Sequence, residues 1–537
     1  MVAGLGGRAS LRSMRSSDAP SGATPLSAST PAAEPPAPAR PADPTARESG
    51  LPDNPWPALW ALVIGFFMIL VDSTIVAVGT PALMTAFDAT VTQVLWVTSA
   101  YLLAYAVPLL ITGRLGDRFG PKRVYLTGLT TFTLASLWCG ISGELSSGIG
   151  MLIAARVLQG LGASMMTPQT MAVITRTFPA DRRGSAMALW GATAGVATLI
   201  GPILGGVLLD RLGWEWMFFI NIPVGIIGLY LAWRLVPTLQ THARTLDWVG
   251  ITLSAVGLFA GVFAIQEGHS YGWGRIWGPI SVPLLLVVGA VLLVAFVWWQ
   301  QRVQRDPLVP LRLFRDRNFS VANVAISTVG FTITAMMFPF MLYAQVARDL
   351  PATGAALLLA PQAVVSILLA PIAGRLTDRV HPRTLAVPAL LGLAVVTWLL
   401  AKVMTPDSPT WTILVVATLM GVANSFIWGP LSASANRNLP MDLAGAGAGV
   451  YNTTRQMGSV LGSAAIAVLM EARIAATLPG ASTPTIAGGS GSAMPAPVKE
   501  AFATALGQAM LLPAAIIVIG AVAALFFETP RHQQRSA

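Results

Sequence analysis

Charged residues are scarce in this chain of 537 residues, where they make up 10% of the total. Soluble globular proteins carry roughly a quarter. Hydrophobic residues reach 54%, and the mean hydropathy is +0.67. A chain with so little charge cannot cover a soluble fold of this length with polar side chains. The composition therefore excludes an ordinary water-soluble protein and indicates an integral membrane protein.

Reactive and metal-binding residue types are equally rare. Cys139 is the only cysteine, which excludes an intrachain disulfide or a thiolate metal site. Four histidines fall in predicted loops or the tail, and no His-Glu-x-x-His sequence occurs. None of the three lysines follows a glycine, so the chain has no Gly-Lys-Ser/Thr phosphate loop and no ATP motor of that kind. We expect no metal and no cofactor, and a proton gradient as the energy source.

Fourteen apolar runs are present, each close to the ~20 residues that cross ~30 Å of hydrocarbon as a helix. Residues 1–55, which precede them, are rich in Ala, Pro, Ser and Thr and predict a disordered tail. The runs cover residues 58–80, 94–112, 124–142, 149–172, 185–209, 215–236, 246–266, 278–299, 319–346, 353–373, 384–402, 411–432, 444–470 and 506–527.

Arginine and lysine predict the orientation. With the N-terminus in the cytoplasm, 25 of the 33 basic residues fall in cytoplasmic segments, six fall outside, and Arg156 and Arg455 lie within spans. The positive-inside rule selects this arrangement. We expect a multi-pass protein of the cytoplasmic membrane with both termini in the cytoplasm. The net charge of +10 then reflects topology rather than binding of nucleic acid.

A charged sequence occurs twice at equivalent places. Gly113-Arg-Leu-Gly-Asp-Arg-Phe-Gly-Pro-Lys-Arg-Val124 follows the second apolar run, and Gly374-Arg-Leu-Thr-Asp-Arg-Val-His-Pro-Arg383 follows the tenth. Two copies, each after the second run of a six-run block, predict duplicated halves. The halves are then residues 56–236 and 319–527, with two inserted helices at 246–299. The linker at 300–318 is either an interfacial amphipathic helix or an ordinary connector, and 528–537 is a C-terminal tail.

The segment Gly113 to Val124 resembles the signature loop of the major facilitator superfamily. Other motifs are similar to those of its fourteen-helix drug:proton antiporter branch. They are Leu70-Val-Asp-Ser-Thr-Ile75, Arg156-Val-Leu-Gln-Gly-Leu-Gly162, the helix-5 motif Gly191, Gly195, Gly201, Pro202, Gly205 and Gly206, and Trp214-Glu-Trp-Met-Phe-Phe-Ile-Asn-Ile-Pro-Val-Gly225. The resemblance implies an all-α membrane protein with two six-helix bundles plus an inserted two-helix hairpin, fourteen transmembrane helices in all. One departure is Arg348-Asp349, where the family often has a glycine.

Asp72 is the only carboxylate deep within a predicted span. It lies fourteen residues past the start of its helix, or roughly 21 Å from the cytoplasmic side at ~1.5 Å per residue. Arg156 lies about 10 Å from the outside, or about 20 Å from the inside of a ~30 Å core. Because an isolated charge in hydrocarbon is costly, we expect the two to face one wet interior region and to influence each other's ionisation. In this hypothesis a cationic substrate competes with the proton for Asp72. The alternative is that both residues only satisfy neighbours in the bundle.

The duplicated loops predict a gate. In the first copy, Asp117 would accept hydrogen bonds from a neighbouring helix N-terminus, while the basic residues pair with acids or headgroups. The gate residues are Gly113, Arg114, Asp117, Arg118, Gly120, Lys122 and Arg123 in the first half, and Gly374, Arg375, Asp378 and Arg379 in the second. The alternative is an anchor on the cytoplasmic side of the membrane.

The glycines of helix 5 allow close helix packing around Pro202, and the resemblance implies a tight seam typical of exporters. We expect a substrate cavity lined by Gln159, Asn221, Asn452, Arg455, Met68 and Phe331. Among these, Met68 and Phe331 belong to a set of Met and aromatic residues whose soft, polarizable surface suits varied apolar ligands. Arg455, near mid-membrane, either binds substrate or locks the bundle.

The leading hypothesis is therefore a secondary active transporter, not an enzyme. It would act as a monomer and export amphipathic, cationic or neutral drug-like compounds against inward proton flow. Its partners would be the substrate, protons and the lipid bilayer. The alternatives are export of one endogenous metabolite or antibiotic, and uptake by symport. A membrane sensor or a membrane-embedded enzyme would be a different class, but the spans carry no His cluster or nucleophile-base arrangement.

Overall fold

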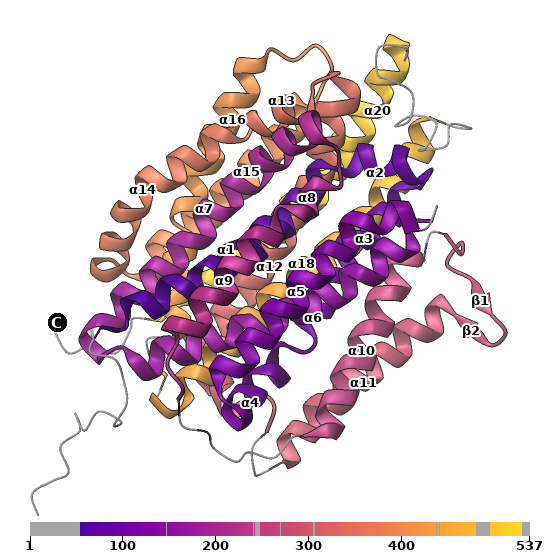
Figure 1. Ribbon diagram of the computed structural model, residues 1–537. Helices are drawn as coiled ribbons and strands as arrows, with labels where there is room; N and C mark the ends of the chain where they lie inside the picture. The colour runs from indigo at the N-terminus through magenta and orange to yellow at the C-terminus, as the bar shows by residue number, and fades with distance from the viewer. Residues whose placement is uncertain are drawn as a thin grey trace, which may run out of the picture. The chain divides into compact units, whose positions relative to one another are not determined.

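A computed structural model describes residues 54–145, 148–239, 241, 247–268, 270–303, 307–436, 438–439, 441–478 and 495–528. Nearly all of the predicted tail at 1–55, together with residues 479–494 and 529–537, lies outside these ranges. The described chain is almost entirely helical (Figure 1). This confirms the predicted fold class.

The N-terminal helices are α1 (Trp56–Val78), α2 (Thr80–Phe87), α3 (Val91–Ala106), α4 (Leu109–Phe119), α5 (Pro121–Leu145), α6 (Gly150–Thr177), α7 (Ala180–Leu212), α8 (Trp216–Phe219) and α9 (Asn221–Leu235). The middle of the chain forms α10 (Trp248–Glu267), β1 (Arg275–Trp277), β2 (Ile280–Ser281), α11 (Val282–Arg302) and the 3-10 helix η1 (Leu311–Arg315). The remaining elements are α12 (Arg317–Leu342), the π-helix η2 (Tyr343–Ala347), α13 (Ala352–Leu357), α14 (Ala360–Arg379), α15 (Pro382–Val403), α16 (Thr410–Ser425), α17 (Trp428–Asn436), α18 (Met441–Thr477), α20 (Ala496–Ala509) and α21 (Leu511–Ala524).

Each of the fourteen apolar runs falls on a helix or on a pair of consecutive helices. Among the described residues, eleven spans are long and apolar enough to cross a membrane, or twelve if the bent pair α3 and α4 counts as one. The runs at 149–172 and 185–209 coincide with α6 and α7, which have 28 and 33 residues but contain more polar positions. The count of fourteen transmembrane helices stays a prediction.

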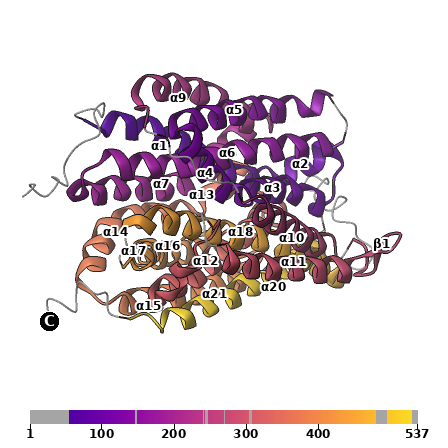
Figure 2. The ribbon, with the colours of Figure 1, turned by 90° about the horizontal axis from the view of Figure 1, so that it is seen from below.

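The helices pack in a reciprocal pattern. Among the N-terminal helices, α1 packs on α7 and α9, and α5 and α3 pack on α6. Among the C-terminal helices, α12 packs on α18 and α21, and α14 on α16. Between the two sets, α3 packs on α18, and α7 packs on α13 and α14 (Figures 1 and 2). The second span of each set thus meets the fifth span of the other, which is the relation that duplicated halves with a two-fold axis produce.

The inserted segment forms a hairpin. Helices α10 and α11 pack side by side, and α10 also contacts α3 and α18 (Figure 2). The short antiparallel strands β1 and β2 join the two helices, with Trp277 paired to Ile280. Only 11% of the most apolar stretch of α11 is buried within the protein. A helix this apolar and this little buried is suited to face lipid.

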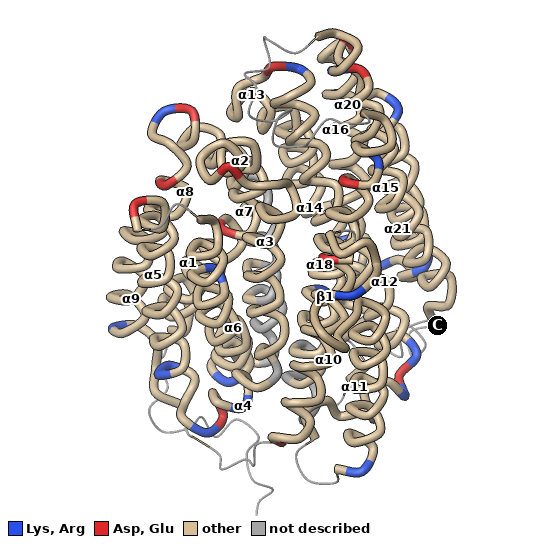
Figure 3. Tube along the Cα trace, turned by 90° about the vertical axis from the view of Figure 1, so that its right-hand side faces the viewer, with Lys and Arg blue, Asp and Glu red and all other residues tan. Residues whose placement is uncertain are grey.

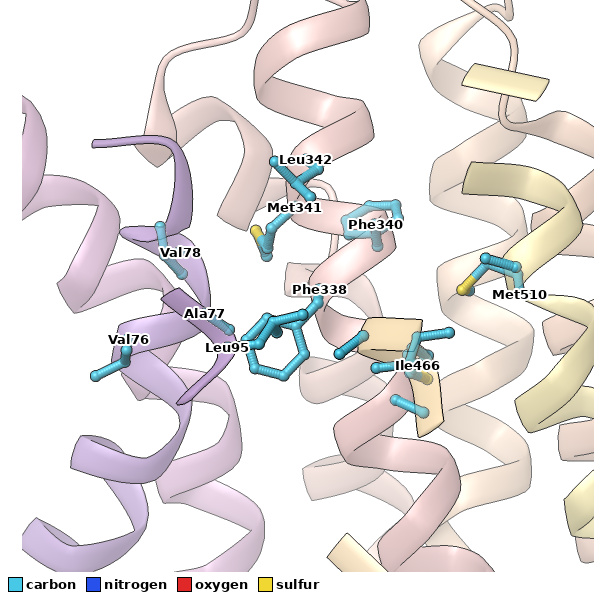
Figure 4. Packing of buried hydrophobic residues seen from close by; sticks show 14 of the residues in the cluster. Val76, Ala77, Val78, Leu95, Phe338, Phe340, Met341, Leu342, Ile466 and Met510 are labelled. Carbon is cyan, nitrogen blue, oxygen red and sulfur yellow. The ribbon is translucent and has the colours of Figure 1, made fainter. Parts of the chain in front are cut away.

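Most charged positions lie at helix ends and in connections, which is what a hydrocarbon layer requires (Figure 3). We call the end of the protein at residues 78–91 the outer end, following the predicted orientation. There a hydrophobic cluster joins the two halves: Val76, Ala77 and Val78 of α1 lie beside Phe338, Met341 and Leu342 of α12, with Leu95 and Ile466 nearby (Figure 4).

The linker at 300–318 does not form an amphipathic α-helix in its described part. Its regular structure is the five-residue η1, and Pro307 and Pro310 explain why a longer helix does not form. Leu308, Val309 and Leu313 are buried in the protein, at 5%, 9% and 1% exposure, rather than presented to a membrane surface. In its described part the linker is therefore a short 3-10 turn with buried apolar side chains.

Candidate functional site

Asp72 and Arg156 form a buried ion pair. Arg156 Nη1 donates to Asp72 Oδ2 at 2.5 Å, and both side chains are 0% exposed. The predicted contact between the two residues is therefore present. Arg156 lies on α6 and makes two further contacts with α3. Its Nε donates to the Val97 carbonyl at 3.0 Å, and its guanidinium lies 4.0 Å from the centre of the Tyr101 ring. Both contacts orient the guanidinium toward α1.

Two amides complete the shell around the carboxylate. Gln159 Nε2 and Asn221 Nδ2 both donate to Asp72 Oδ1, at 2.8 and 2.9 Å. Gln159 also donates to Ser136 Oγ at 2.7 Å and accepts from Arg156 Nη1 at 2.6 Å. The carboxylate thus receives donors from α6 and α9 on both oxygens, and its negative charge is matched by one guanidinium. Such a network is stable only when its members are paired, because unpaired buried polar groups are costly.

The location of this network differs from the prediction in one respect. The sequence predicts that Asp72 and Arg156 face a wet region, and that Gln159 and Asn221 line a substrate cavity. All four side chains are 0–2% exposed and lie among N-terminal helices. A cationic substrate cannot reach the carboxylate in this conformation, because α1, α6 and α9 enclose it. The roles proposed for these residues stay predictions.

The glycines of the helix-5 motif lie in α7 and pack against helices on two of its sides. A Cβ at Gly205 would lie 2.5 Å from Ile75 Cγ1, and a Cβ at Gly201 would lie 3.2 Å from the Val71 carbonyl, so these glycines allow α7 to approach α1 beside Asp72. Gly206 faces the other half, where its Cβ would lie 2.6 Å from the Thr353 Cα. Gly191 and Gly195 lie earlier in α7, and Pro202 lies inside it.

Polar contacts close the outer end between the halves. Asp210, at the end of α7, accepts from the backbone N–H groups of Ala352 and Thr353 at 3.1 and 2.8 Å, and so caps the N-terminus of α13. Gln345 Nε2 donates to the Val78 carbonyl at 2.8 Å, and Thr92 Oγ1 donates to Glu471 at 2.6 Å. The sequence analysis missed Asp210. Its place four residues after Gly206 was the available signal.

The departure at Arg348-Asp349 has a local consequence. Asp349 adopts a φ of 54°, the left-handed region in which glycine is favoured. Its carboxylate pairs with Lys499 at the start of α20. An aspartate here therefore supplies an ion pair at a position whose backbone suits a glycine.

The first signature segment is not a loop over most of its length. Residues 113–119 belong to α4, and α5 begins at Pro121, so Gly120 alone connects them, with a φ of 92°. Asp117 pairs with Arg176 in the last turn of α6 at 3.5 Å, and both are 27% exposed. The remaining basic residues differ: Arg114 is buried and donates to the Pro307 carbonyl, Arg118 lies over the Phe119 ring, Lys122 is half-buried and Arg123 is exposed.

The second copy ends α14 in a different way. Gly374, Arg375, Asp378 and Arg379 lie in its last turns, with both arginines exposed. His381, which stands where the first copy has Gly120, has a φ of −57° and caps α15 by accepting from the Arg383 N–H at 3.1 Å. Burial, and then the charge of Arg383, lower the pKa of His381. The cap replaces the positive-φ glycine, which explains how the turn forms without one.

The other predicted cavity residues are divided between the halves. Met68 is 2% exposed, in a hydrophobic cluster of N-terminal helices that also contains Val460 and Ala464 of α18. Phe331 of α12 and Arg455 of α18 are partly exposed, and Asn452 is 7% exposed. Phe331, Asn452 and Arg455 lie on helices that meet the N-terminal half, since α12 packs on α1 and α18 packs on α3.

Comparisons with known proteins agree with this architecture. A family model described as the Major Facilitator Superfamily matches residues 62–463. The chain is 50% identical over 480 residues to an uncharacterized MFS-type transporter, Rv1250, of Mycobacterium tuberculosis, covering 88% of this chain and 81% of that one. It is 28% identical to the tetracenomycin C resistance and export protein of Streptomyces glaucescens, covering 91% and 94%. A bacterial homolog of the human lysosomal transporter Spinster, solved in an inward-facing and unoccupied conformation, aligns with a TM-score of 0.59 at 16% identity, covering 88% and 97%.

Proposed function

The chain belongs to the major facilitator superfamily, and on that basis we propose that it is a secondary active transporter that exports amphipathic, drug-like compounds across the cytoplasmic membrane in exchange for protons. Its substrates are small molecules and it works within a membrane, as this family of transporters does. The direction of transport is supported by the similarity to an antibiotic resistance and export protein, and by the packing of the helix-5 glycines against both α1 and α13.

The observation that carries the proton coupling is the enclosed Asp72 network. In this conformation the ionised carboxylate has one cation and two amide donors around it. A proton on Asp72 would leave the Arg156 charge buried without a counter-ion, and breaking one side of a buried ion pair costs about 3–5 kcal/mol. Protonation therefore disfavours this conformation and favours another in which the pair is separated or hydrated.

Coupling follows from linkage. If protonation of Asp72 favours the alternate conformation, then the alternate conformation binds the proton more tightly by the same free energy. A substrate that binds preferentially to this conformation then drives the proton off, without touching Asp72 itself. Alternating access would release the substrate on one side of the membrane and the proton on the other. This indirect coupling replaces the direct competition at Asp72 that we predicted from the sequence.

The test is transport by purified protein in proteoliposomes with an imposed pH gradient, where a trapped indicator reports the internal pH. We expect the gradient to drive movement of an amphipathic fluorescent substrate, the dye, with protons moving in the opposite direction. Asp72→Asn should abolish gradient-driven movement but leave passive exchange of dye. Asp407→Asn, at an exposed carboxylate in the connection between α15 and α16, is the matched control.

Three results would contradict the proposal. Proton counterflow that persists in Asp72→Asn removes Asp72 from coupling. Co-transport of proton and dye in one direction means symport. Flux of a single metabolite, with no flux of the other compounds in a broad panel, favours an exporter dedicated to one endogenous metabolite or antibiotic.

A further inference from the structure

One face of α18 carries a stripe of polar residues across the middle of the protein. At 3.6 residues per turn, these residues fall within about 100° of the helix circumference. They are Asn452, Arg455, Gln456, Ser459 and Ser463. Polar residues confined to one side of a helix of this kind face protein or water rather than lipid.

Contacts place this stripe at the junction of the halves. Ser463 Oγ lies 2.6 Å from Ser99 Oγ of α3, and Ser459 Oγ donates to the Gly330 carbonyl of α12 at 3.2 Å. Gly330 also lets α12 pass against the Arg455 backbone. The stripe therefore runs where α3 of the N-terminal half meets α12 and α18 of the C-terminal half.

Arg455 differs from Arg156 in its surroundings. The ionisable groups that act on it are Tyr105, Tyr451 and Tyr101, and in the described ranges no carboxylate is among them. No hydrogen bond or ion pair of its guanidinium is found within the same ranges. Arg455 is also partly exposed, whereas Arg156 is 0% exposed. It is thus a partly exposed residue at membrane depth whose cation has no protein counter-ion in the described chain.

A second observation marks the same place. The phenol of Tyr451, one helical turn from Arg455, is 6% exposed, and its oxygen has no partner among the described residues. A buried hydroxyl without a partner costs free energy unless a ligand or water satisfies it. Among the described residues, the acids Asp210, Glu267 and Glu471 also lie where the halves meet. They are not counter-ions of Arg455, because each bonds to another group at the outer end.

We infer that Arg455 and Tyr451 bind the carboxylate of an amphipathic organic monoanion. This inference rests on the proposed transport function and names its substrate class. A carboxylate matches the planar fork of an arginine, accepts a further hydrogen bond from a phenol, and neutralises the charge of Arg455. This replaces the cationic or neutral substrate predicted from the sequence, because Asp72 already has its cation.

The test compares pyrenebutanoate with its methyl ester, which differ in charge but share the apolar part. Binding is measured by quenching of protein fluorescence in nanodiscs, and export is measured in proteoliposomes. We expect the wild-type protein to prefer the acid. Arg455→Gln should weaken binding of the acid by about 10- to 100-fold and leave binding of the ester unchanged, because a hydrogen bond to a charged group is lost. Arg455→Lys should recover part of the affinity, and Tyr451→Phe should lower it by a smaller factor.

Arg473→Gln, at an exposed arginine near the outer end of the same helix, is the matched control and should change neither affinity. Equal binding of acid and ester by the wild-type protein overturns the inference. Equal loss of both ligands in Arg455→Gln does so too, since it indicates a structural role. If the acid binds as expected but no gradient moves it, the site stands and the proposed transport function fails.

Discussion

Gly206 is the position where a single methyl group should change the balance between conformations. The residue lies in α7, and its Cβ would lie 2.6 Å from the Thr353 Cα, 2.7 Å from the Thr353 nitrogen and 2.8 Å from the Ala352 carbonyl carbon of α13. Real Cβ atoms essentially never come within 3.0 Å of such atoms. All three are backbone atoms, so no side-chain rotation can relieve the contact. Gly206→Ala must therefore move α7 away from α13.

The size of the effect follows from the geometry. Ordinary contact begins at 3.4 Å, so the two helices must separate by about 0.8 Å at the outer end. Overpacking of this kind costs typically about 1–3 kcal/mol. Separating α7 from α13 would also lengthen the two hydrogen bonds that backbone N–H groups of α13 donate to Asp210. In the proposed transport cycle the alternate conformation opens the contact between α7 and α13, so the cost would fall on the closed state only. The equilibrium should then shift toward opening by about 5- to 150-fold.

A cysteine reporter measures the shift. Ala77 is 3% exposed and lies beside Phe338 in the cluster that joins the halves (Figure 4). Ala77→Cys in a Cys139→Ser background should react slowly with a membrane-impermeant maleimide, and Gly206→Ala should speed the reaction in proportion to the shift. Gly449→Ala is the control, because a Cβ there meets nothing within 4 Å. An unchanged labelling rate in Gly206→Ala, or an equal rise in both variants, would refute the reasoning.

Three further predictions concern stability. Gly162→Val should lower the melting temperature by several degrees, since a Cβ there meets the α5 backbone at 2.6 Å, whereas Gly261→Val, with nothing within 4 Å, should not. Arg176→Gln should lower the free energy of unfolding by less than about 1 kcal/mol, and by less still at high salt, because its ion pair with Asp117 is partly exposed to solvent. A larger loss of stability in thermal unfolding would argue for a structural latch. Burial and a neighbouring arginine lower the pKa of His381, so the folded state binds fewer protons there than the unfolded state. The wild type should therefore lose stability relative to His381→Gln as pH falls below the ordinary value of 6.5, and parallel melting curves across that range would contradict this.

The membrane spans could be predicted because hydrocarbon thickness sets the length of an apolar run, and each run became helical. The Asp72–Arg156 contact could be predicted in the same way, since counting residues along two helices gives the depth of each charge. Depth does not give rotation about a helix axis. The sequence therefore could not show that Gln159 and Asn221 turn toward Asp72, or that α1, α6 and α9 close around it.

Contacts made by a single residue between distant helices could not be predicted from the sequence either. The capping of α13 by Asp210 requires α7 and α13 to meet, which no local pattern states. Pro307 and Pro310 could have argued against an amphipathic helix in the linker, because a helix seldom continues through either residue. The charges of the signature segment predict a loop, yet only Gly120 has a backbone conformation outside the helices.

The inserted hairpin covers one of the two lines along which the halves meet. Helix α10 packs on both α3 and α18, and Trp96 of α3 donates to Glu267 of α10. In the described chain the hairpin does not pack in this way on the equivalent line between α7 and α14. Under the proposed transport function, a cargo dissolved in the bilayer would therefore meet the uncovered line beside the glycines of α7.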